Sequence, residues 1–112
     1  MIQQGDIYWV HFQNKKGSVM VGDHPALILQ STFINQTRIQ TIVVAGITSN
    51  TRLKIIPGTV VIGQESGLKK ESIINTSQIH TIDKTDLERK IGKISSEKLE
   101  EVFTGIDHLF GR

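Results

Sequence analysis

The feature that most constrains the fold is a succession of short β-prone runs between residues 6 and 83. The runs are rich in Ile, Val and Thr, and glycine, proline or asparagine stands between most of them. This spacing is typical of a sheet built from short antiparallel strands. We expect a connecting loop at 31–38 and a tight turn at Pro57-Gly58. Strands are expected at 6–12, 25–30, 39–48, 59–62, 72–75 and 78–82.

The first of these runs alternates in the way that a strand with two different faces requires. Its odd and even positions should point to opposite sides of the sheet, with Ile7, Trp9 and His11 on one face and Tyr8, Val10 and Phe12 on the other. The runs at 25–30 and 39–48 are instead apolar almost throughout. Strands of that kind are buried on both faces or closed into a barrel.

Helical signals are confined to the end of the chain. Thr85 and Glu88 form a capping box, which predicts a short helix that ends at Gly92. Ser96 is predicted to cap a second helix, and Gly111 to close it. The apolar positions of this second helix fall on one face: Leu99, Val102, Phe103, Ile106, Leu109 and Phe110.

Five to seven strands followed by an amphipathic helix predict a mainly β fold, a small antiparallel barrel capped by the C-terminal helix. The 112 residues fit a single domain spanning 1–112. Because the chain has no cysteine, disulfides and thiolate zinc sites are excluded. No two histidines have the spacing of a zinc-binding helix, so we expect neither metal nor cofactor.

The first ten residues show no basic start followed by an apolar run, so no signal peptide is expected. No apolar stretch approaches the roughly 20 residues that cross a bilayer. We therefore expect a cytoplasmic protein that does not bind membranes.

The charges are unevenly distributed, although the formal net charge is only +2. Acidic residues gather in the last third, whereas residues 11–70 carry only Asp23 and Glu65. The same region holds seven cations, namely Lys15, Lys16, Arg38, Arg52, Lys54, Lys69 and Lys70. If this part of the chain folds as one unit, its surface could bind an anion such as RNA. The alternative is that these cations are ordinary solvated side chains.

His24 can be read either as a catalytic residue or as a residue with a purely structural role. It stands before Pro25, which confines it to extended geometry at the mouth of a strand. An imidazole exchanges protons near neutral pH, so His24 is either a proton carrier or the end of a loop. For His11 and His108 we favour structural roles. Trp9 and Tyr8 are expected in the core, which leaves Phe33 as an exposed aromatic residue.

Five segments together resemble the MazF/PemK toxins over nearly the whole chain. They are 5–12 (GDIYWVHF), the Gly17-Ser18 loop, 24–29 (HPALIL), the end of a strand at 45–48 (AGIT) and 78–84 (QIHTIDK). The resemblance implies an SH3-like antiparallel β-barrel related to that of CcdB. It also implies a sequence-specific endoribonuclease of a toxin–antitoxin system, which cleaves single-stranded RNA without a metal ion.

The implied site differs from the family pattern at two positions. The family has an arginine before the loop proline and a glutamate after Gly-Ser, where this chain has His24 and Val19. Thr48 matches the family threonine. We hypothesise that His24 moves the proton while Thr48 donates to a phosphate oxygen. Further RNA contacts are expected from Lys15, Lys16, Ser18, Arg52, Lys54, Gln78 and His80.

The resemblance also implies partners, namely a second copy of the chain in a homodimer and an acidic cognate antitoxin. Two other functions stay open. One is a non-catalytic CcdB-like or decayed toxin that binds a protein target, which the two departures favour. The other is an unrelated barrel that serves as an adaptor.

Overall fold

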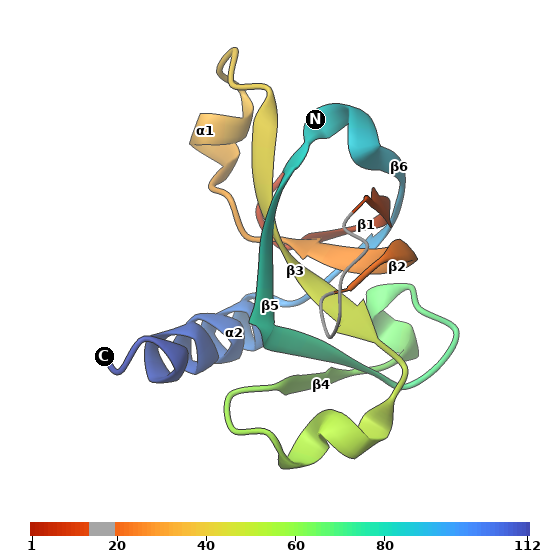
Figure 1. The fold of residues 1–112 in the computed structure, drawn as a ribbon, viewed down its shortest axis with the longest axis vertical. Helices are drawn as coiled ribbons and strands as arrows, with labels where there is room; N and C mark the ends of the chain where they lie inside the picture. The colour runs from red at the N-terminus through yellow and green to blue at the C-terminus, as the bar shows by residue number, and fades with distance from the viewer. Residues whose placement is uncertain (14–19) are drawn as a thin grey trace.

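The computed structural model describes residues 1–13 and 20–112, and the predicted contacts at Lys15, Lys16 and Ser18 lie outside these residues. Six antiparallel strands form one sheet in the order β4-β5-β3-β2-β1-β6 (Figure 1). The strands are β1 Asp6–Phe12, β2 Gly22–Ile28, β3 Thr41–Thr48, β4 Val60–Ile62, β5 Ser72–Asp83 and β6 Leu87–Lys93. The helices are α1 Thr32–Asn35 and α2 Ser96–Leu109, with 3₁₀ turns η1 Thr51–Ile55, η2 Gln64–Ser66 and η3 Lys84–Asp86.

The sheet curls because β5 bends. Ala45 of β3 pairs with Ile79 and Gly46 pairs with Asn75, so residues 76–78 of β5 have no partner in the ladder. An irregularity of this kind increases the local twist and turns the strand. The two runs predicted at 72–75 and 78–82 are therefore the halves of one bent strand, and the sheet forms a half-barrel (Figure 1).

Two apolar clusters occupy the two sides of the curled sheet. The helix-side core lies under α2 and includes Ile7, Leu27, Ala45, Ile47, Ile74 and Val102. The second core, on the other side, contains Val10, Phe12, Ala26, Ile28, Ile42 and Val44. The predicted alternation along β1 is confirmed, and residues 26–28 of β2 and 44–47 of β3 are buried because both faces of these segments are covered.

The helix predicted between Thr85 and Gly92 is wrong, because residues 87–93 form strand β6. This segment pairs with β1, from Asp6 opposite Lys93 to Val10 opposite Leu87. At Gly92 the backbone of β6 approaches η2 so closely that an added Cβ would lie 1.9 Å from the Ser66 carbonyl oxygen. Backbone pairing with β1 therefore prevails over the local capping signal.

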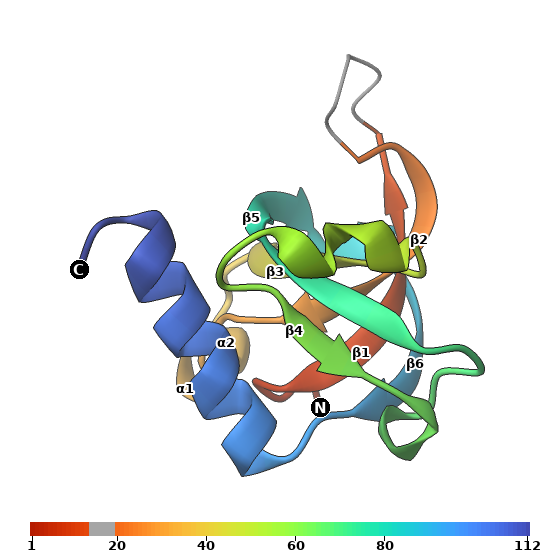
Figure 2. The same ribbon diagram turned by 90° about the horizontal axis from the view of Figure 1, so that it is seen from below.

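Helix α2 forms as expected, with one shift at its start. Ser95 rather than Ser96 caps it, because the Ser95 hydroxyl accepts from the Lys98 backbone N–H at 3.2 Å. Figure 2 shows α2 along one side of the molecule beside β4, where Val102 is fully buried. The predicted apolar face reaches the core only in part, since Leu109 and Phe110 are exposed.

Two loop predictions also meet the structure. The segment 31–38 contains the short helix α1 within the expected connection. Gly58 has a φ of 90°, as a tight turn at Pro57-Gly58 requires. Within the residues described here, no helix has both the length and the apolar character needed to span a bilayer.

Candidate functional site

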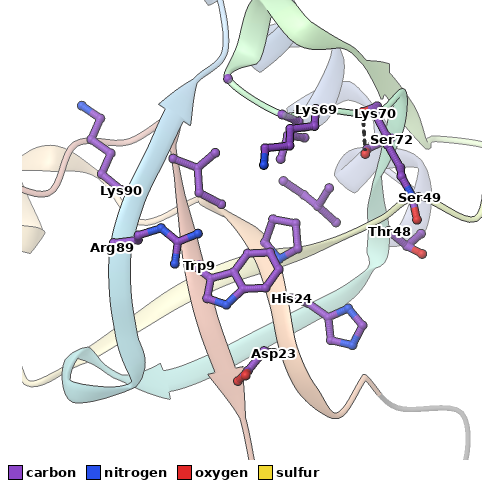
Figure 3. Close-up of a pocket in the computed structure, with 15 residues that line it drawn as sticks. Trp9, Asp23, His24, Thr48, Ser49, Lys69, Lys70, Ser72, Arg89 and Lys90 are labelled. Carbon is purple, nitrogen blue, oxygen red and sulfur yellow. Dashed lines mark hydrogen bonds between the residues drawn. The ribbon is translucent and has the colours of Figure 1, made fainter.

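His24 and Thr48 lie on neighbouring strands and face the same side of the sheet. The β2–β3 pairing ends at Ala26 and Gly46, and His24 and Thr48 each lie two residues beyond this pair, on the same side of the sheet. Both residues line a cavity of about 600 Å³. In Figure 3 their side chains form one border of that cavity, and both point the same way. The fold thus brings together the two residues predicted to carry catalysis.

The His24 imidazole is oriented by one hydrogen bond. Its Nε2 lies 2.8 Å from the Val21 carbonyl oxygen, and a carbonyl can only accept, so Nε2 carries the proton. In the neutral ring Nδ1 then holds the lone pair. Within residues 1–13 and 20–112, no hydrogen bond occupies Nδ1. The geometry therefore leaves one ring nitrogen available to take up a proton.

The Thr48 hydroxyl is held at the point where β3 ends. Its oxygen accepts from the Asn50 backbone N–H at 3.1 Å, and the Asn50 side chain in turn accepts from the Arg52 N–H. Because accepting uses only a lone pair, the hydroxyl proton is free for an outside acceptor. A phosphate oxygen is such an acceptor.

Gln78, on the next strand, lies on the same side as Thr48. Its side-chain oxygen accepts from the Met20 backbone N–H at 3.4 Å. Gly46 of β3 lies close to both Met20 and Gln78. An added Cβ at this glycine would lie 2.7 Å from the Met20 sulfur and 3.6 Å from the Gln78 Cβ. Strands β2, β3 and β5, which are consecutive in the sheet, therefore bring His24, Thr48 and Gln78 to one face.

His80 also lies on this face but in a different environment. Its ring packs on Phe12 with centroids 4.9 Å apart, and Phe12 lies 6.3 Å from the His24 ring on its other flank. Burial lowers the pKa of His80. Among the described residues no hydrogen-bond partner reaches its buried Nε2. A separate hollow beside it is lined by Asp83 and Asp86, so its surroundings are acidic.

The two cations expected beyond Thr48 do not line the cavity. Arg52 and Lys54 lie on η1, and both are exposed. The Lys54 ammonium is 2.8 Å from the Glu71 carboxylate and is paired with it. The structure thus places these residues near the end of β3 but not in the cavity beside His24 and Thr48.

Sequence reasoning placed none of the residues that give this cavity its character at the site, although Lys69 and Lys70 were among the cations predicted to meet an anion. We call it the Trp9 cavity: its apolar surface comes from Trp9, Pro25, Ile47, Leu68 and Ile91, and its cations are Lys69, Lys70, Arg89 and Lys90. The Arg89 guanidinium carbon lies 5.6 Å from the centre of the Trp9 ring. Trp9 is only half-buried, not in the core. Trp9 shares one face of β1 with the polar residue His11, and this pattern indicated that the face is not fully buried.

The remaining histidines take structural positions. His11 Nδ1 is 2.7 Å from the Asp23 carboxylate, an exposed contact that joins β1 to β2. His108 is exposed in the last turn of α2, where a cation favours the helix dipole. In the part of the chain that the structure describes, no three His, Asp or Glu residues are grouped to hold a metal ion.

Comparison with known proteins places these observations in a family. Residues 3–110 match the family described as PemK-like, MazF-like toxin of type II toxin–antitoxin system. The chain is 34% identical over 107 residues to Endoribonuclease MazF6 of Mycobacterium tuberculosis, covering 95% of this chain and 94% of that protein. It is also 34% identical over 112 residues to Endoribonuclease MazF of Staphylococcus saprophyticus, covering 99% and 92%.

A solved structure shows the same fold. It is an endoribonuclease in complex with its cognate antitoxin from a mycobacterial species, with a TM-score of 0.78. The alignment covers 99% of this chain and 96% of that one at 21% identity. The expected mainly β fold with a C-terminal helix is confirmed.

Proposed function

Because the chain belongs to the PemK-like, MazF-like toxins of type II toxin–antitoxin systems, we propose that it cleaves single-stranded RNA at specific sequences and without a metal ion. The relatives named above are endoribonucleases, and they do not favour a toxin that only binds a protein target. The observation that carries the proposal is that His24 and Thr48, on neighbouring strands, line one cavity that is rich in cations.

The chemistry follows from the atoms available. His24 Nδ1 takes the proton from a ribose 2′-hydroxyl, whose oxygen forms a bond to the adjacent phosphorus. The bond from phosphorus to the 5′-oxygen breaks, and that oxygen takes a proton from solvent water, which leaves a cyclic phosphate and a free 5′-hydroxyl. Thr48 donates to a non-bridging phosphate oxygen as charge builds there.

Two further parts of the proposal concern RNA binding and partners. Lys15, Lys16, Ser18, Arg52, Lys54, Gln78 and His80 are proposed as RNA contacts outside the catalytic pair. A cognate antitoxin is proposed as the natural inhibitor, supported by the relative whose structure holds one. We also propose that residues 1–112 form one toxin domain, that the chain works as a homodimer, and that it meets its RNA in the cytoplasm.

The test follows one long single-stranded RNA with a chelator present. General acid–base catalysis is worth about 10²–10⁴-fold, so His24→Ala should slow cleavage by that order. Thr48→Val should also slow it, while Thr48→Ser, which keeps the hydroxyl, should retain much of the rate. Arg38→Ala is the control, because Arg38 is exposed and does not line the cavity. The Arg38→Ala protein should cleave the RNA at the wild-type rate.

His24→Arg separates two roles for position 24. A guanidinium binds phosphate but does not exchange protons at neutral pH. If His24 carries the proton, the arginine variant cleaves slowly although it still binds phosphate. High activity in His24→Arg would make the position a phosphate clamp, and an unchanged rate in His24→Ala would remove it from catalysis. Loss of cleavage on adding chelator would contradict the metal-free mechanism.

A further inference from the structure

We propose that the Trp9 cavity binds a nucleobase of the RNA strand next to the cleaved phosphate, stacked on Trp9 and held by Arg89 and Lys69. This inference rests on the proposed function and names the subsite that its RNA would occupy. The starting observation is a cavity of about 600 Å³ that combines an apolar surface with a cationic border (Figure 3).

The apolar part of the cavity suits a flat ring. Trp9 offers a half-buried indole, and Pro25 and Ile47 lie beside it in the lining. The Arg89 guanidinium lies over the indole with its carbon 5.6 Å from the ring centre. A planar guanidinium on an aromatic face can extend the stack to a base and still donate to its edge or to a phosphate. Single-stranded RNA is commonly recognised in this way.

Most of the cations around the cavity are not paired with a carboxylate. Within the described ranges, Lys69, Lys70 and Arg89 form no ion pair with a carboxylate, whereas Lys54 is bound to Glu71 and Lys90 to Asp6. The carboxylate of Asp23, which also lines the cavity, is engaged by His11. In Figure 3 the Lys69 side chain extends toward the centre of the cavity. Cations held apart from any carboxylate favour an anionic ligand.

The position of the cavity ties it to the catalytic pair. His24 and Pro25 are consecutive on β2, as are Ile47 and Thr48 on β3, so their side chains point to opposite sides of the sheet. Pro25 and Ile47 therefore share the Trp9 side of the sheet, while His24 and Thr48 face the other side, yet all four residues line the cavity, with His24 and Thr48 at its border. A strand of RNA that passes the ends of β2 and β3 reaches both sides. The occupant is thus a base adjoining the cleaved phosphate, not a separate small ligand.

The test uses a spectroscopic property of the chain. Trp9 is its only tryptophan, so its emission reports on the cavity directly. A single-stranded oligodeoxynucleotide lacks the 2′-hydroxyl needed for cleavage and serves as the probe. We expect saturable quenching of Trp9 emission, and little quenching with an abasic oligonucleotide of equal length. Loss of one stacked base should weaken binding roughly 5- to 100-fold.

Variants locate the effect. Arg89→Ala and Lys69→Ala should weaken binding of the oligonucleotide, while Arg38→Ala should leave its affinity unchanged. In RNA cleavage, Trp9→Phe should keep the preferred cutting sites, because phenylalanine still stacks, whereas Trp9→Leu should lose or shift them. His24→Ala should still show quenching, so failure of the catalytic proposal would not hide the subsite.

Three outcomes would overturn the inference. Equal quenching by the abasic oligonucleotide would mean that the cavity binds only backbone. RNA cleavage without any response of Trp9 would mean that the RNA passes elsewhere, while the proposed function stands. A response of Trp9 to the antitoxin but to no nucleic acid would make the cavity a protein-binding site.

Discussion

At the scale of single residues, two histidines near Phe12 of the second core have different environments. His24 is hydrogen-bonded through Nε2 and leaves Nδ1 open, whereas the Nε2 of His80 is buried and, among the described residues, unpartnered. Phe12 lies near both rings, 4.9 Å from His80 and 6.3 Å from His24 between centroids. Because a buried imidazole disfavours the charged form, the two histidines are suited to different tasks.

His80 should make the stability of the fold depend on pH. Its folded pKa lies below the usual value of 6.5, so the unfolded chain binds the proton more readily. The stabilisation is therefore complete above about pH 6.5 and is lost as the pH falls toward the folded pKa. In His80→Leu, which has no such proton, the free energy of unfolding should change less over this window. Chemical denaturation at several pH values measures it, with both proteins compared first at about pH 8. Parallel curves for the two proteins would contradict this role.

At the scale of elements, the position of the edge strand β6 depends on Gly92. Gly92 lets β6 lie against η2, where the Ser66 carbonyl occupies the place of a side chain. Through β6, this contact positions Arg89 over Trp9. The packing of a 3₁₀ turn thus fixes one wall of the Trp9 cavity.

Gly92→Ala should therefore destabilise the protein and alter the cavity. Overpacking costs about 1–3 kcal/mol, and the obstacle here is backbone rather than a flexible side chain. Thermal unfolding should show the loss, and Trp9 emission should shift as Arg89 moves. Gly63→Ala is the matched control: its nearest neighbour is the Glu65 side chain at 3.2 Å, which can move. Equal stability of the two variants would show that the contact at Gly92 is unimportant.

The elements also show what sequence can and cannot predict. Alternation in β1 and continuous apolar runs in β2 and β3 were sufficient, because burial on one or both faces leaves a direct trace in the sequence. The capping signal before β6 was misleading, since pairing with β1 depends on residues far away in the chain. Arg89 was missed for that reason. That His24 and Thr48 act together was implied by the resemblance, but the unpaired cations around Trp9 could be recognised only in the structure.

At the scale of the whole molecule, the structure determines which apolar residues are available for the proposed homodimer interface. The apolar residues of 72–75 cannot supply an interface, because Ile73 and Ile74 are fully buried within the chain. Leu109 and Phe110 at the end of α2 do remain exposed. These exposed side chains at the end of α2 are the apolar surface that a homodimer could bury.

We expect sedimentation to show a dimer at micromolar concentration. If the end of α2 contributes to it, a Leu109→Ser and Phe110→Ser double variant should shift the equilibrium toward monomer. Phe33→Ser, which changes an exposed aromatic residue on α1, tests whether any lost apolar surface has the same effect. A wild-type monomer under these conditions would remove the dimer from the proposal.

The order of the strands has a consequence for how the protein is made. β1 is synthesised early, yet its outer neighbour β6 comes late, with Asp6 opposite Lys93. Contacts so distant in sequence form slowly and only after both partners exist. During translation, a nascent chain therefore has Trp9 long before it has the Arg89 that covers it. Neither the sheet nor the cationic wall of the cavity is complete until β6 has left the ribosome, so a partly synthesised chain is not yet the finished toxin.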